Sequence, residues 1–134
     1  MRSSERKLRL FVLCAEAWVL MPLFAVGLRV APGFVFRHIR HRTRLHGADR
    51  SELAAQVASA VQRSAAWLPA RAATCLPRAC ASHVMLGRRG AVSRVRIGVA
   101  KTARGMTAHA WVEAGGIVIG GDTPSPSFVA LPIL

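Results

Sequence analysis

The stretch ATCLPRAC, residues 73–80, decides how the rest of the chain is interpreted. Thr74 stands directly before Cys75, and a threonine hydroxyl can accept one of the unpaired N–H groups of a helix that begins at the next residue. Pro77 is compatible with the first turn of that helix, where its missing N–H costs little. We therefore predict a helix from Cys75 to about Leu86. Three interpretations of its first residue, Cys75, are open at this point: a nucleophile, a metal ligand or a small buried side chain.

The cysteines are poorly placed for a metal ion or a disulfide framework. Cys75 and Cys80 are five residues apart, roughly 140° around a helix, and no Cys-x-x-Cys pair is present. Cys14 brings the number of cysteines to three, and no secretory cleavage pattern follows the N-terminal apolar run. We expect no metal site and a reducing, cytoplasmic location.

Downstream, the stretch TAHAWVEAGGIVIGGD at 107–122 predicts a β-hairpin. Its two strands, over 107–113 and 116–120, meet at Gly115-Gly116, which supplies the turn. The preceding segment VSRVRIGVA at 92–100 predicts a further strand. The cysteine helix is thus followed by a small sheet.

The register of this hairpin decides whether His109 has a carboxylate partner. If Gly115-Gly116 forms a two-residue turn, His109 lies directly opposite Asp122. If the turn shifts to Ala114-Gly115, Asp122 becomes a diagonal neighbour on the same face. Either register brings a carboxylate to the imidazole, whereas an odd-length loop or a bulge would break the alignment.

Together, these three residues predict nucleophilic catalysis. The positive end of a helix and its free N–H groups favour the thiolate of Cys75 and can stabilise an oxyanion. His109 can take the cysteine proton and return it to a leaving amine, while Asp122 holds the imidazole tautomer. Taken singly, each residue is ordinary: a buried cysteine, a polar strand position and a turn residue. Taken jointly, in this order, they favour a Cys-His-Asp triad.

The motifs around these residues resemble those of known protein families. A cysteine at a helix start, followed by a histidine and an aspartate, resembles the transglutaminase-like, papain-related fold. More narrowly, LPARAATCLPRACA at 68–81, RIGV at 96–99 and HAWVEAGG at 109–116 with a following aspartate resemble the leader peptidases of lasso peptide biosynthesis. The resemblance covers residues 50–122, and the apolar, arginine-flanked N-terminal segment also fits that family.

The resemblance implies a fold and a site. The fold class is α+β, a transglutaminase-like or papain-like cysteine protease core. Its nucleophile stands at a helix N-terminus packed on a small antiparallel sheet, preceded by apolar N-terminal helices. Cys75 corresponds to the nucleophile, His109 to the base and Asp122 to its orienting partner. Leu76 and Arg78 match the family's post-cysteine motif without an assigned role. The two glycines directly before Asp122 depart from the family's pattern and leave its placement open.

The implied function is removal of the leader from a lasso peptide precursor through a thioester acyl-enzyme, without a metal or organic cofactor. The chain is too short for a separate leader-binding domain, so the resemblance implies the standalone protease of a split system. Its partners would be the precursor peptide, a small leader-binding recognition protein and a separate cyclase. Two alternatives stay open: a transglutaminase-like acyltransferase, and a basic, membrane-associated binding protein without catalytic activity.

The composition indicates one compact domain. The chain has 134 residues, 52% of them hydrophobic, and a formal net charge of +13. We divide it into an apolar N-terminal helical segment with a basic connector, 1–48, and a catalytic core, 49–134. The connector, RHIRHRTRLHGADR at 37–50, lacks aromatic residues that stack on bases, so we expect a solvated positive segment and no nucleic-acid partner.

Residues 8–30 form the most apolar segment, and between Leu10 and Leu28 only Glu16 is charged. The pattern predicts a helix that is bent or split at Pro22. Its length would suffice for a membrane span, and hydrophobicity alone does not separate a span from a buried helix. The internal glutamate and proline favour packing on the domain over insertion into lipid.

The catalytic core opens with a second amphipathic helix. Asp49 and Glu52 resemble a capping box at its start. Apolar residues then repeat at helical spacing from Leu53 to Leu68, and Pro69 ends the pattern. The predicted order is therefore helix, helix and sheet, with the cysteine at the second helix start.

Overall fold

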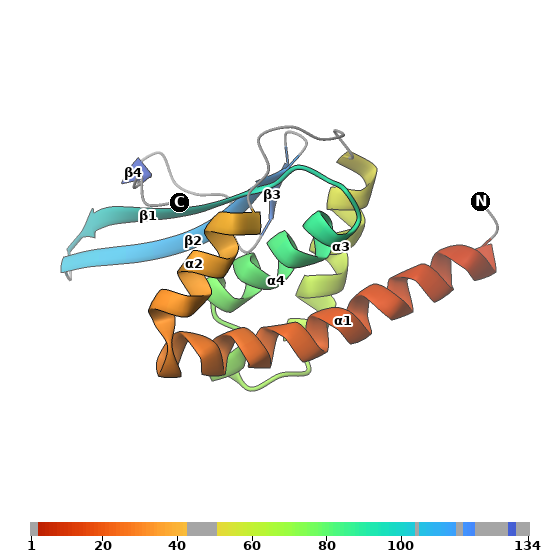
Figure 1. The fold of residues 1–134 in the computed structure, drawn as a ribbon, viewed down its shortest axis with the longest axis horizontal. Coiled ribbons are helices and arrows are strands. Elements are labelled where there is room, and N and C mark those ends of the chain that lie inside the picture. The colour runs from red at the N-terminus through yellow and green to blue at the C-terminus, as the bar shows by residue number, and fades with distance from the viewer. Residues whose placement is uncertain (1–2, 43–50, 104, 115–116, 120–128, 131–134) are drawn as a thin grey trace.

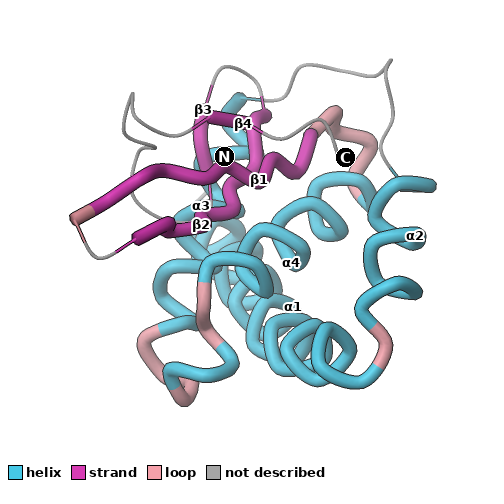
Figure 2. The backbone as a smooth tube through the Cα atoms, turned by 90° about the vertical axis from the view of Figure 1, so that its left-hand side faces the viewer, coloured by secondary structure: helices cyan, strands magenta, loops and turns pink. Residues whose placement is uncertain are grey.

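The computed structural model describes residues 3–42, 51–103, 105–114, 117–119 and 129–130. Its elements in chain order are α1 (Ser3–Val30), α2 (Pro32–Arg42), α3 (Ser51–Ala65), the 3-10 turn η1 (Ala70–Ala72), α4 (Cys75–Arg88), β1 (Arg94–Thr102), β2 (Gly105–Ala114), β3 (Ile117–Ile119) and β4 (Val129–Ala130). The helices gather on one side of an antiparallel sheet with strand order β3-β2-β1-β4 (Figures 1 and 2). The predicted α+β class is confirmed.

α1 is one helix that continues through Pro22, so of the two predicted alternatives, a bend or a split, the split is wrong. A proline removes a single N–H from the helix, and the buried side chains of Met21 and Phe24 hold the chain against the core on both sides of it. With Leu13 and Ala17 they form one buried face at helical spacing. Through this face α1 packs against α3 and α4, as the sequence predicted.

The basic connector is in part helical. α2 includes the connector's first residues, and its apolar side chains Val35 and Ile39 are buried against the core. Arg37 is exposed, as expected of a solvated segment. The predicted cap at Asp49 falls within 43–50, which lies outside the described residues.

One helix ends earlier than predicted, and the other ends close to the predicted residue. α3 ends at Ala65 rather than Leu68, and the chain turns there with the Trp67 N–H donating to the Ser64 carbonyl at 3.1 Å. α4 continues to Arg88 and stops where Gly90 adopts a φ of +76°, a conformation that favours glycine.

The sheet is centred on β1 and β2, which pair along their full length from Arg94 opposite Glu113 to Thr102 opposite Gly105. β3 then pairs with the end of β2, with Ala114 opposite Ile117. This is the register predicted for a two-residue turn. β4 pairs with β1 and was not predicted.

α4 occupies the centre of the molecule. It contacts α1, α3 and β2, and every residue from Ala79 to Leu86 is buried. A helix enclosed in this way is held on all sides by the core. Its first turn, which begins at Cys75, is therefore rigidly placed.

Candidate functional site

The helix start at Cys75 is confirmed, but its cap differs from the prediction. Thr74 occupies the N-cap position with an extended backbone (φ −72°, ψ 170°), and its carbonyl accepts the Arg78 N–H at 3.2 Å. The threonine side chain makes no cap hydrogen bond. Since Pro77 has no N–H, the first-turn donors that Thr74 leaves uncapped are the amides of Cys75 and Leu76.

Arg78 ties this first turn to the loop before it. Its Nε donates to the Ala73 carbonyl at 2.7 Å, and the Ser82 hydroxyl donates to the Arg78 carbonyl at 2.8 Å. The guanidinium is half-buried, so a positive charge lies beside the turn that carries Cys75. Arg78 therefore fixes the approach of the chain to the cysteine, a structural role for a residue that had none assigned.

The three cysteines occupy different environments, and all are free thiols. Cys75 is half-buried, whereas Cys80 is 1% exposed. Burial in apolar surroundings raises the pKa of the Cys80 thiol to about 12. Cys14 lies half-buried on α1. Cys75 is thus the only one of the three at a helix N-terminus.

His109 lies in the middle of β2, opposite Gly98 of β1. Its ring stacks on that of Trp111, with centroids 6.0 Å apart and planes at 23°. The Trp111 Nε1 donates to Glu113 Oε1 at 3.2 Å, and Arg96 Nε lies 3.5 Å from Glu113 Oε2. This chain of contacts, the His109 network, orients the imidazole from one face of the sheet.

The His109 network lies on the face of β2 opposite to the core. Successive residues of a strand point to opposite faces, and Ala110 and Val112 belong to the core cluster together with side chains of the helices. Cys75 packs against that same cluster. α4 contacts β2, so the two elements that carry Cys75 and His109 are neighbours. The Cys75 side chain packs on the core cluster, whereas the His109 side chain lies on the opposite face of β2.

The placement of Asp122 rests on the hairpin register. The observed pairs Ala114–Ile117, Glu113–Val118 and Val112–Ile119 follow the register that puts His109 opposite Asp122. Asp122 itself falls within 120–128, which lies outside the described residues.

Metal ligation has no support in the part of the chain that the structure describes. No group of three or more histidine, cysteine, aspartate or glutamate side chains lies close enough to hold an ion there. The groups that the structure places together at the helix start are a thiol, two backbone amides and a guanidinium, while the imidazole of His109 lies on the other face of β2.

Sequence reasoning missed the His109 network and the bond from Arg78. A signal for the network was present in HAWVE, since positions two apart on a strand share a face. A glutamate two residues after a tryptophan can therefore accept its indole N–H. The contact from Arg96 depends on how β1 pairs with β2, which required the structure.

A comparison with known families gives one match. The sequence profile described as transglutaminase-like superfamily matches residues 17–131. The matched segment contains the second half of α1, all of α4 and the whole of the β1–β2 ladder. No curated protein and no solved structure matches the chain significantly.

Proposed function

Because the chain belongs to the transglutaminase-like superfamily, which typically includes cysteine proteases and acyltransferases, we propose that it is a cysteine peptidase that removes the leader peptide from a lasso peptide precursor. The observation that carries the proposal is the position of Cys75, the first residue of the buried central helix. The nucleophiles of acyl transfer need donors that stabilise an oxyanion, and such donors lie at this helix start.

The proposed reaction has two halves. The Cys75 thiolate attacks the carbonyl carbon of the scissile peptide bond, and the amides of Cys75 and Leu76 donate to the oxyanion. His109, which has received the cysteine proton, gives it to the leaving amine of the core peptide. Water, deprotonated by His109, then attacks the thioester and releases the leader as a carboxylic acid.

The roles of His109 and Asp122 are part of the proposal. Catalysis requires the imidazole to come within hydrogen-bond reach of the Cys75 sulfur. α4 packs on β2, but His109 lies on the face of β2 away from the core cluster against which Cys75 packs, so the proposal requires a rearrangement of β2 that brings the imidazole to the sulfur. The observed register of β2 and β3 supports Asp122 as the residue that orients His109. A leader-binding recognition protein would deliver the precursor, and a separate cyclase would use the released amine.

Cleavage of a synthetic precursor tests this proposal. We expect Cys75→Ala to abolish cleavage, by several orders of magnitude in rate, whereas Cys80→Ala and Cys14→Ala retain most of it. Activity in Cys75→Ala comparable to that of the wild type would refute the assignment.

The acceptor of the acyl group distinguishes a peptidase from an acyltransferase. In water enriched in oxygen-18, a peptidase adds one heavy oxygen to the C-terminal carboxylate of the leader. An acyltransferase supplied with an amine would instead yield an amide without the heavy oxygen. Mass spectrometry of the leader fragment therefore decides between the two.

A further inference from the structure

The outer face of α1 is apolar although its inner face already contributes to the core. Its large exposed side chains are 48–79% accessible, and they are Leu8, Phe11, Val12, Trp18, Val19, Leu23, Val26 and Val30. We call this set the outer face of α1. A continuous apolar stripe of this length is unusual on a soluble protein. It indicates a surface that binds another protein or a membrane.

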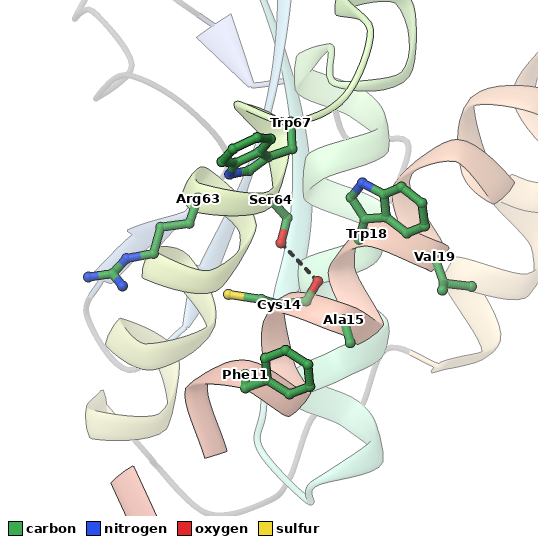
Figure 3. Close-up of a pocket in the computed structure, with 8 residues that line it drawn as sticks. All are labelled: Phe11, Cys14, Ala15, Trp18, Val19, Arg63, Ser64 and Trp67. Carbon is green, nitrogen blue, oxygen red and sulfur yellow. Dashed lines mark hydrogen bonds between the residues drawn. The ribbon is translucent and has the colours of Figure 1, made fainter. Parts of the chain in front are cut away.

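A hollow extends this face towards α3. It has a volume of about 620 Å³ and apolar walls that include Phe11, Trp18 and Trp67 (Figure 3). Its floor is fixed by the Ser64 hydroxyl, which donates to the Cys14 carbonyl at 2.8 Å. Trp67 is 84% exposed beside it. Two tryptophans therefore line the hollow that joins the outer face to α3, and tryptophan is enriched where membrane proteins meet lipid headgroups.

The contacts of Glu16 argue against α1 as a membrane span. Its carboxylate accepts from Arg88 Nη1 and from Arg89 Nη2, both at 2.6 Å, and its side chain is only 12% exposed. A span would have to break these pairs, remove the inner face from the core and leave a carboxylate within hydrocarbon. α1 has the length and hydropathy of a span, but its packing fits a helix that lies in the plane of the membrane.

Charge favours lipid over the other possible occupants. Exposed cations stand at both ends of the outer face, Arg6, Lys7 and Arg9 at one end and Arg29 at the other. The formal charge of +13 opposes the close approach of a second copy. A protein partner would pair hydrogen-bonding groups across the interface, whereas the indole N–H of Trp18 is the only side-chain donor within the outer face.

We propose that the outer face of α1 docks the protein in plane on a bilayer that contains anionic phospholipid. The apolar side chains enter the boundary between headgroups and acyl chains, and the flanking cations contact phosphate groups. This docking is independent of the peptidase chemistry, because it uses none of the residues assigned to catalysis.

Vesicle flotation with the full chain tests the proposal. The wild type is expected to float with vesicles of phosphatidylcholine and phosphatidylglycerol, and much less with phosphatidylcholine alone. Its tryptophan fluorescence should shift to the blue as Trp18 and Trp67 leave water. Val19→Glu should lower the bound fraction about tenfold, because a carboxylate is costly in the apolar layer. The matched control Met106→Glu also adds a charge at an exposed apolar residue, 74% accessible on the strand pair, and should bind as the wild type does.

Four results would overturn the proposal. The first is a wild type that does not float with the anionic vesicles. The second is equal flotation of Val19→Glu and Met106→Glu, with Leu23→Glu taking the place of Val19→Glu if that variant fails to fold. The third is a dimer in vesicle-free buffer that Val19→Glu dissociates, which would make the outer face an interface between copies. The fourth is retention of the bound wild type after alkaline carbonate, which should release it, because retention would show a span instead.

Discussion

Cys80 lies five residues after Cys75 on the same helix, and its environment makes it the natural control. Since burial raises the pKa of its thiol from the ordinary 9.0 to about 12, the folded state keeps the proton at a pH where the unfolded chain loses it. Stability therefore does not depend on this group below about pH 9 and falls as the pH rises towards 12. The slope is at most about 1.4 kcal/mol per pH unit.

Cys80→Ala should remove this alkaline slope. Urea unfolding at pH 8 and at pH 10.5 measures it in the wild type and in the variant. The wild type should lose more unfolding free energy between the two values than Cys80→Ala does. Equal losses would show that the thiol is not shielded from water in the way its burial indicates.

Glu113 acts on His109 through Trp111 in the His109 network. Glu113→Ala removes the acceptor of the indole N–H and the partner of Arg96, so the imidazole loses its lateral support. We expect cleavage to fall about 10- to 100-fold, since small misplacements of catalytic groups cost that much. The fall should lie in kcat, with an altered pH profile.

Rescue separates positioning by Glu113 from a general loss of structure. Glu113→Gln keeps an acceptor for Trp111 and should recover part of the activity. Lys101→Gln, at the exposed far end of β1, should leave activity unchanged. An unaltered pH profile in Glu113→Ala would remove the positioning role.

At the scale of elements, the ion pairs between α1 and α4 differ in their surroundings. The side chain of Arg89 is 26% exposed and also donates to the Met85 carbonyl at 2.9 Å, whereas that of Arg88 is 56% exposed. An exposed ion pair contributes little to stability, so Arg88→Ala should lower the free energy of unfolding by less than about 1 kcal/mol. Arg89→Ala should lower the free energy of unfolding by about 1–2 kcal/mol, because Glu16 and the Met85 carbonyl each lose a hydrogen-bond donor. Chemical unfolding of both variants checks the order, and the reverse order would contradict it.

The elements also show what the sequence could predict. The turn at Gly115-Gly116 has a specific chemistry, and the resulting register is observed at all three described pairs of β2 and β3. The helix start at Cys75 was likewise predicted from Thr74 and Pro77, although the Thr74 hydroxyl makes no cap hydrogen bond. Local signals of this kind lie within a few residues, which is why they can be identified without a structure.

Other features depended on contacts between distant segments. α1 is apolar all round, so its periodicity could not indicate which face enters the core. The pairing of Glu16 with Arg88 and Arg89 joins residues 72 and 73 positions apart in the sequence. The same holds for the location of His109 on the face of β2 away from the core cluster, and for β4. The position of Asp122 remains a prediction from the hairpin register.

For the whole molecule, the proposed function predicts dependence on a partner. A leader held by a recognition protein that also docks on this chain would make delivery of the scissile bond effectively intramolecular, at a local concentration of roughly millimolar for a short flexible link. We expect slow cleavage by the isolated chain and an acceleration of at least about tenfold on adding the partner. Titration of the partner at fixed enzyme and precursor measures this. Full cleavage without a partner, unchanged by its addition, would show that recognition resides in this chain.

The charge of the molecule predicts how the acceleration by the partner depends on salt concentration. With a formal net charge of +13, the protein attracts an acidic leader or an acidic partner over a distance set by the ionic strength. The acceleration should therefore shrink at high salt if charge steering contributes to docking. An acceleration that is independent of salt would assign docking to apolar contacts.

The central claim is that Cys75 is the nucleophile and that His109 activates it. A synthetic leader peptide that ends in an electrophile in place of the scissile bond tests this claim most directly, because it forms a bond only with an activated thiol in the substrate position. Intact-protein mass spectrometry followed by peptide mapping should find one adduct, on Cys75, formed much more slowly in His109→Ala. An adduct on Cys14 instead, or equal rates in the wild type and His109→Ala, would contradict the account.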